Sequence, residues 1–126
     1  MKYNSKKVTV DWYTFDSTVE ADYYRENKDR IELIHPRYII QPEFTKNGKK
    51  FKSVSYVADF ELGDWTVIDI KGMATETAML KRKMFEYAYP DKQLLRLVFS
   101  KKRWGRVEYD KLIKLRKNAK LLQSDN

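Results

Sequence analysis

Apolar and polar side chains alternate along residues 51–62, which is the pattern of a β-strand with one buried face. After Gly63-Asp64, a second alternating segment covers about residues 65–71, so the two segments predict an antiparallel hairpin. The apolar face of the first strand carries Val54, Tyr56, Ala58, Phe60 and Leu62, and the other face carries Ser53, Ser55, Val57, Asp59 and Glu61.

The register of this hairpin follows from keeping the apolar side chains on one face. A two-residue loop would place Asp59 opposite Ile68 and would mix the two faces. A three-residue loop with a bulge instead pairs Phe60 with Ile68 and Asp59 with Asp69. We therefore expect the longer loop, with the Cβ atoms of the two aspartates about 5 Å apart.

The rest of the pattern predicts helices and strands around this hairpin. A helix begins at Ser17, because Ser17-Thr18-Val19-Glu20 fits a capping box, and it extends towards Ile34 and ends before His35-Pro36. The order α-β-β-β-α-β-α predicts an α/β (α+β) fold in which a central mixed sheet of about four strands is flanked by helices. The further elements are a strand at 38–44, a helix at 75–90, a strand at 93–99 and a basic amphipathic helix at 107–122.

Length and composition exclude several classes of protein. The 126 residues suffice for a single domain, in which residues 1–14 form an arm or an extra strand. Since there is no cysteine and a single histidine, His35, disulfides and thiolate or multi-histidine metal sites are excluded. A metal site would use oxygen ligands, which favours Mg²⁺ or Mn²⁺. No apolar segment approaches the roughly 20 residues of a membrane span, so we expect a cytoplasmic protein with no membrane partner.

The net charge of +8 is concentrated near the C-terminus. Residues 101–120 contain nine lysines and arginines against two acids, whereas the first hundred residues are nearly neutral. A concentrated basic face is typical of a phosphate-binding surface, and a solvated helix face is the alternative interpretation. In the basic segment, residues 101–126, the candidate DNA-binding residues are Lys101, Lys102, Arg103, Arg106, Lys114 and Lys117.

The predicted hairpin brings two acids and a lysine together. Asp59 and Asp69 face each other, and Lys71 points from the same face two residues later. Two carboxylates this close repel each other unless a proton or a cation lies between them, so the arrangement suits a divalent metal. The alternative is a salt-bridge patch on a solvated sheet face, and the spacing alone does not decide between the two.

These residues resemble the active-site motif of the PD-(D/E)XK nuclease superfamily, in Ala58-Asp59-Phe60 followed by Asp69-Ile70-Lys71-Gly72. With Phe15-Asp16-Ser17-Thr18-Val19-Glu20-Ala21 before them and Gln41-Pro42-Xaa-Phe44 between, the chain resembles more closely the small phage-encoded nucleases of the endonuclease I and Holliday-junction-resolvase type. The resemblance covers roughly residues 15–99. Ala58 stands where the superfamily's name has proline, and Asp69 is one of the two acids that its notation allows.

This resemblance implies a restriction-endonuclease-like core and Mg²⁺-dependent hydrolysis of phosphodiester bonds, with Mn²⁺ as a substitute. Asp59 and Asp69 would bind the metal, and the carbonyl of Ile70 would be a further ligand. Lys71 would position or help to deprotonate the attacking water and would steady charge on the phosphate. Glu20 would complete the site from the first helix.

Several residues have a second interpretation. Glu20 is also the expected partner in the capping box of the first helix. Gln41 either points into the site or is a polar residue of an edge strand. Lys81 and Lys83 either reach a phosphate or are solvated helix lysines. His35 is interpreted as structural.

We therefore expect a DNA endonuclease that cuts branched DNA as a homodimer, without a small-molecule cofactor. The junction preference and the dimer come from the resemblance, because resolvases of this type cut two strands of a junction symmetrically. A nuclease for linear duplex or single-stranded DNA is the alternative within the class, since one core serves many substrates. A non-catalytic basic DNA-binding module is the alternative outside it. The resemblance also suggests a bacteriophage origin, for which the location would be the bacterial host cytoplasm.

Overall fold

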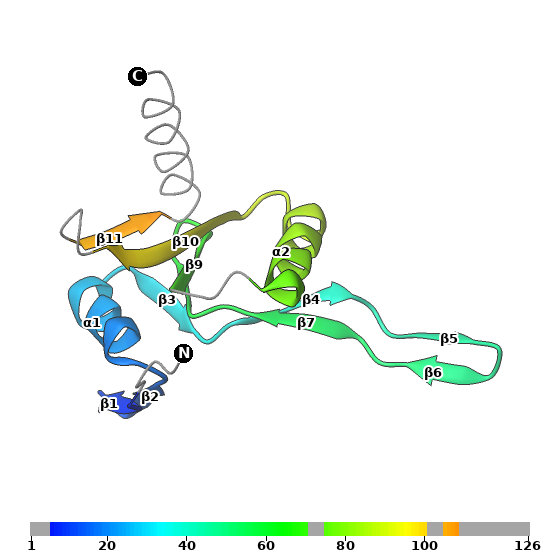
Figure 1. Cartoon of the computed structure of the whole chain (residues 1–126), viewed down its shortest axis with the longest axis horizontal. Helices are drawn as coiled ribbons and strands as arrows, with labels where there is room; N and C mark the ends of the chain where they lie inside the picture. The colour runs from blue at the N-terminus through cyan, green and yellow to red at the C-terminus, as the bar shows by residue number, and fades with distance from the viewer. Residues whose placement is uncertain (1–5, 71–74, 101–104, 109–126) are drawn as a thin grey trace, which may run out of the picture.

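The computed structural model describes residues 6–70, 75–100 and 105–108 of the chain. These residues form a mixed α+β structure of two helices and several small sheets (Figure 1). In chain order the elements are β1 (Val8–Val10), β2 (Tyr13–Phe15), α1 (Thr18–Asn27), β3 (Ile31–Ile34), β4 (Arg37–Gln41), β5 (Phe44–Lys46), β6 (Lys49–Phe51), β7 (Val54–Val57), β8 (Phe60–Leu62), β9 (Thr66–Ile70), α2 (Glu76–Ala88), β10 (Gln93–Ser100) and β11 (Gly105–Glu108).

The largest sheet has five strands in the order β11-β10-β9-β8-β3. β9 and β10 are parallel and are joined through α2, whereas the other neighbours in the sheet are antiparallel. The central sheet is therefore mixed, as expected, but its members differ from the prediction. The expected strand at 38–44 lies outside this sheet as β4, whereas β3 and part of β11 lie where helices were expected.

The two faces of this sheet pack against different helices. Ile68 and its neighbours on one face belong to a core cluster with α1, in which Phe60 is fully buried. The adjacent Val67 points to the other face and packs with Leu94 and with Phe85 of α2. Both faces of β9 are thus covered by apolar side chains, which explains why its sequence is almost continuously hydrophobic.

A long two-stranded ribbon leaves the sheet at a bend. β3 pairs with β8 inside the sheet, and the continuing strands β4 and β7 pair with each other outside it. At the bend His35 has a positive φ of 52°, and its N–H donates to the carbonyl of Asp59 at 2.9 Å. Beyond β4 and β7 the ribbon ends in the β5–β6 hairpin, which projects away from both helices (Figure 1).

This bend corrects one expectation about residues 51–62. The five apolar side chains of the alternating segment are all at least partly buried, but they do not share one face. Tyr56 and Ala58 belong to the cluster with α2, whereas Phe60 and Leu62 belong to the cluster with α1. The chain changes faces at Asp59, where β7 has ended and β8 has not begun.

The predicted hairpin loop is confirmed. Phe60 pairs with Ile68, and the loop of three residues ends with Trp65 at a φ of 70°. The Trp65 N–H donates to the carbonyl of Leu62 at 3.1 Å, as in a turn followed by a left-handed residue. The regular pairing stops at Phe60, so Asp59 and Asp69 are not a pair of this ladder.

Two predicted helices need correction. The first helix ends at Asn27 rather than near Ile34, because the Asn27 side chain donates to the carbonyl of Tyr23 at 3.0 Å and the following residues enter the sheet as β3. A helix beginning at Val107 is also wrong, since β11 pairs antiparallel with β10 there. The remainder of that expected helix, from residue 109, lies outside the described residues. Within the described part of the chain, neither helix is long and apolar enough to cross a membrane.

Candidate metal centre

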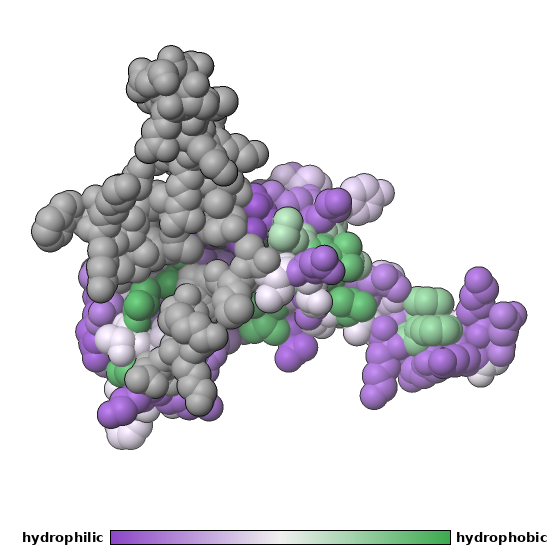
Figure 2. Space-filling model, viewed as in Figure 1, coloured by the Kyte–Doolittle hydropathy of each residue, from purple (hydrophilic) through white to green (hydrophobic). Residues whose placement is uncertain are grey.

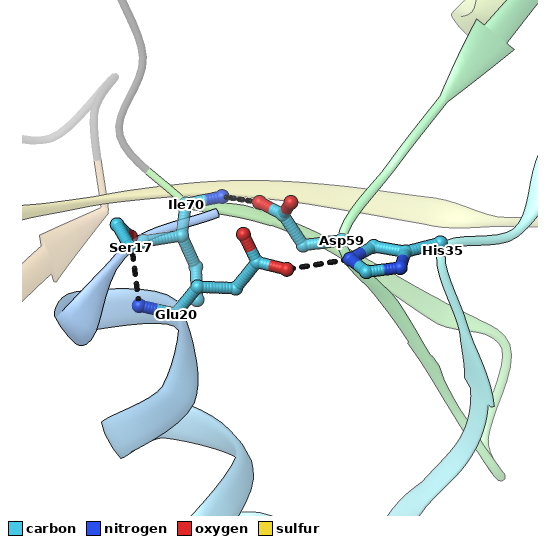
Figure 3. A network of polar contacts seen from close by, with 5 residues as sticks. All are labelled: Ser17, Glu20, His35, Asp59 and Ile70. Carbon is cyan, nitrogen blue, oxygen red and sulfur yellow. Dashed lines mark hydrogen bonds and ion pairs between the residues drawn. The ribbon is translucent and has the colours of Figure 1, made fainter. Parts of the chain in front are cut away.

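Glu20 enters the candidate site from the first turn of α1. Ser17 caps this helix, and its Oγ accepts a hydrogen bond from the Glu20 N–H at 3.1 Å. The Glu20 carboxylate, which is almost fully buried, lies 2.6 Å from Nε2 of His35 (Figure 3). Of the capping box, the hydrogen bond from the Glu20 N–H to the Ser17 side chain is therefore present. The Glu20 side chain is instead directed to His35 at the bend of the ribbon.

Asp59 lies opposite His35 at this bend. Its Oδ2 accepts a hydrogen bond from the Ile70 N–H at 2.6 Å, and its own N–H donates to the Ile68 carbonyl at 3.0 Å. The Asp59 side chain thus takes the place of a backbone acceptor at the end of β9. This interaction orients the carboxylate towards that of Glu20 (Figure 3).

One ligand atom from each of Glu20, His35 and Asp59 lies within 4.8 Å of the others. Two carboxylates at this separation repel each other unless a proton or a cation lies between them. The two acids supply oxygen ligands, which Mg²⁺ and Mn²⁺ both accept, and an imidazole nitrogen suits a transition metal better than Mg²⁺. These three residues could together hold a divalent cation.

Asp69 is oriented by a tyrosine and is not a member of this three-residue group. Its Oδ2 accepts a hydrogen bond of 2.6 Å from the hydroxyl of the buried Tyr56. Burial raises the pKa of Tyr56 well above its ordinary value, and the charge and hydrogen bond of Asp69 raise it further. The charge of Asp59 also raises this pKa, so both aspartates act on the same hydroxyl.

Arg96 of β10 is the cationic neighbour of Asp69. The two residues are partners in the parallel pairing of β9 and β10, so their side chains leave the sheet on the same face. The positive charge of Arg96 lowers the pKa of Tyr56, opposite in sign to the aspartates. A half-buried guanidinium therefore lies on this side of the site.

Of the other predicted site residues, Ile70 contacts the site through its backbone, and the rest lie on other elements or outside the described residues. Ile70 is buried, and its N–H rather than its carbonyl is the group seen to contact Asp59. Gln41 lies at the end of β4 away from His35, next to the outer ribbon. Lys81 and Lys83 lie on α2, the helix over the face of Val67. Arg106 is in β11, and Lys71, Lys101, Lys102, Arg103, Lys114 and Lys117 lie outside the described residues.

Sequence reasoning missed three residues of this site, namely His35, Tyr56 and Arg96. His35 was interpreted as structural because a single histidine before a proline has no partner in sequence. Tyr56 was assigned to an apolar face, where a phenol hydroxyl carries no separate signal. The partnership of Arg96 with Asp69 would have followed from aligning residues 93–97 beside 66–70 in a parallel pair.

Comparisons with known proteins place the chain in a family. Searches of curated proteins and of solved structures give no match. A family model with the description "Protein of unknown function (DUF1064)" matches residues 1–105. The matched part contains Glu20, His35, Asp59 and Asp69 and most of the chain, so this chain belongs to the DUF1064 family.

Proposed function

We propose that this protein is a metal-dependent nuclease that hydrolyses phosphodiester bonds in DNA. The observation that carries the proposal is the convergence of Glu20, His35 and Asp59, whose ligand atoms lie within 4.8 Å of one another. Helix α1 and the two strand connections at the ribbon bend supply these side chains, and the Glu20 carboxylate is buried there. Burial of a carboxylate beside a second acid is costly unless a proton or a cation compensates it.

In this proposal each residue of the site has a separate role in hydrolysis. A bound Mn²⁺ or Mg²⁺ would polarise the phosphoryl oxygens and make a bound water more acidic. Glu20 and Asp59 would hold the metal, and the Ile70 N–H would keep the Asp59 carboxylate oriented. Tyr56 would hold Asp69 in position beside them. Lys71 follows Asp69 by two residues and keeps the role in positioning water that its sequence motif suggests.

DNA is the proposed substrate because the chain is strongly basic. Its net charge of +8 provides the long-range attraction that a polyanion needs. A cluster of carboxylates weakens phosphate binding by repulsion, so a protein that only bound DNA would gain nothing from Glu20 and Asp59. A metal at this cluster would remove the repulsion and would give the acids a catalytic role.

Cleavage of an end-labelled four-way junction, beside a linear duplex with the same arm sequence, tests the proposal. Both substrates are incubated with Mg²⁺ and, separately, with Mn²⁺. We expect Glu20→Gln and Asp59→Asn each to lower the cleavage rate by about 100-fold or more, as for loss of a group that holds or orients a metal. Asp22→Asn on the same helix is the matched control, because Asp22 is exposed and paired with Arg25, and it should leave the rate unchanged.

The comparison of the junction with the linear duplex distinguishes a junction-specific nuclease from a general one and from a DNA-binding module. Paired symmetric nicks in the junction alone would support a branched-DNA preference and the expected homodimer. Equal cleavage of both substrates would keep the nuclease and discard the junction preference. Absence of cleavage with either metal, with DNA binding retained, would overturn the proposal in favour of a non-catalytic binding module.

A further inference from the structure

The β5–β6 hairpin, with its flanking residues 43–52, is an exposed arm that the proposed chemistry does not use. Every residue from 42 to 53 is exposed to solvent, although β4 and β7, which carry the arm, are partly buried against α2. Figure 1 shows the arm extending beyond the rest of the described chain. A segment of this kind buries little surface of its own, so its sequence is free to serve an intermolecular contact.

Two features nevertheless hold the arm in one conformation. Asn47 and Gly48 have φ values of 53° and 76°, which are the left-handed conformations of a tight two-residue hairpin turn. Phe44 and Phe51 are opposite each other and stack with their ring centroids 4.7 Å apart and their planes within 8°. An isolated two-stranded hairpin is marginal in water, so this stack and turn supply the order that the core does not.

Lysines dominate the surface of the arm. Lys46 and Lys49 are opposite each other and share a face with the phenylalanine pair, since they lie two residues from it on each strand. Lys49 Nζ lies 5.1 Å from the ring centroid of Phe51. Lys50 is paired with the only acid of the arm, Glu43, at 3.4 Å. Figure 2 shows this end of the molecule as mostly hydrophilic with a small hydrophobic patch.

We propose that the β5–β6 hairpin is a DNA-binding arm that enters the major groove of duplex DNA. The major groove, about 12 Å wide, admits a two-stranded ribbon. Lys46 and Lys49 at the tip would contact phosphates on the groove walls, and the Phe44–Phe51 stack would keep the strands together. Duplex RNA is excluded as the partner because its major groove is too narrow and deep for such an arm.

The ribbon also sets where the arm would meet DNA. β6, β7 and their flanking residues connect Lys49 to Asp59 through about ten residues of extended chain, at most about 34 Å. Base pairs repeat about every 3.4 Å along a duplex, so this span corresponds to at most roughly ten base pairs. The arm would therefore hold the duplex within one helical turn of the candidate centre. This binding role does not require that the centre be catalytic.

Binding to a short DNA duplex in EDTA, measured by fluorescence anisotropy over a salt series, tests the arm without hydrolysis. The variant is Lys46→Gln/Lys49→Gln, and the charge-matched control is Lys6→Gln/Lys7→Gln, which changes two exposed lysines before β1. We expect the arm variant to weaken binding about tenfold or more at 0.1 M salt and to reduce the salt-dependence slope by about two, whereas the control keeps the slope.

Several outcomes would contradict the proposal that the hairpin binds DNA. The arm variant could bind DNA with wild-type affinity, or the control variant could lose as much affinity as the arm variant. The arm variant could also lose as much affinity for duplex RNA of the same sequence as for DNA. Binding of polyglutamate but not of DNA would overturn the proposal in favour of an acidic protein partner. A second variant, with residues 44–51 replaced by Gly-Gly, removes the arm while leaving β4 and β7, and it should bind DNA no better than the lysine variant. Failure of cleavage by the wild-type protein, with arm-dependent binding intact, would refute only the proposed nuclease.

Discussion

At the scale of single residues, Tyr56 shows how the two aspartates, Asp59 and Asp69, are coupled. Its hydroxyl donates to Asp69, and its ionisation is also opposed by the charge of Asp59. Burial is the larger cause of its raised pKa. Tyr56 therefore stays protonated in the folded chain at pH values at which a free tyrosine ionises.

This raised pKa predicts a loss of stability at alkaline pH. A group whose pKa is higher in the folded state stabilises the fold fully below its unfolded pKa, near 10 for tyrosine. Above that pH the unfolded chain releases the proton and the folded chain does not, so the free energy of unfolding should fall by about 1.4 kcal/mol per pH unit for Tyr56. In Tyr56→Phe this contribution disappears, and urea unfolding between pH 9 and 11.5 should show a shallower decline. An unchanged slope would contradict the assigned burial of the hydroxyl.

Residue identity indicated the candidate acids but not their partners. Asp59, Asp69 and Glu20 are candidates on sequence alone because carboxylates at a motif spacing carry a chemical signal of their own. His35 could not be placed beside Glu20, because the contact joins residues 15 apart through a bend that the local pattern does not indicate. The left-handed backbone at His35, unusual for a residue other than glycine, is visible only in the folded chain.

At the scale of elements, an ion pair beneath the sheet links β8 to the turn after α2. Lys92 Nζ lies 2.9 Å from Oε2 of Glu61, and both side chains are largely buried. The Tyr38 hydroxyl of β4 also donates to Glu61, and burial together with that carboxylate raises the pKa of Tyr38. The pair therefore connects three separate elements on the face of the sheet that α2 covers.

Removal of one partner of this pair should destabilise the protein strongly. Lys92→Met leaves Glu61 buried without its cation, and we expect the free energy of unfolding to fall by about 3 kcal/mol. Lys50→Met is the matched control, since its pair with Glu43 is exposed and should contribute at most about 1 kcal/mol. Chemical denaturation of both variants measures the difference. An equal loss of unfolding free energy in both variants would mean that the buried pair contributes no more to stability than the exposed pair.

The alternation of side chains predicted elements but not their faces. The three-residue loop and the pairing of Phe60 with Ile68 followed from the rule that apolar residues share a face. The same rule failed across Asp59, because a bend reverses the faces while the alternation continues unbroken in sequence. Glu61 was consequently expected beside Asp59 on a polar face, whereas it is buried.

At the scale of the whole molecule, the proposed metal would make the stability of the fold depend on a bound cation. α1, the ribbon bend and β9 converge on Glu20 and Asp59, so repulsion between these acids acts on the packing of three elements. A cation bound only by the folded chain would stabilise all of them, by about 2.7 kcal/mol at a concentration 100 times its dissociation constant. The hydrophobic pattern predicted the central strands β8, β9 and β10 of the mixed sheet but neither of its edge strands, β3 and β11. It did not predict this convergence either, since the convergence depends on where the ribbon bends.

The consequence is a reversal of stability between the wild-type chain and Asp59→Asn. In EDTA the variant removes one of two repelling charges, and its amide oxygen still accepts from the Ile70 N–H, so its melting temperature should be higher by about 3–5 °C. With saturating Mn²⁺ the wild-type chain should gain several degrees and the variant little, so that the order inverts. Differential scanning calorimetry in both buffers measures the two shifts. The opposite result would be a wild-type melting temperature that Mn²⁺ does not change, together with a lower melting temperature of the variant in EDTA. That result would show that the acids serve only as hydrogen-bond acceptors.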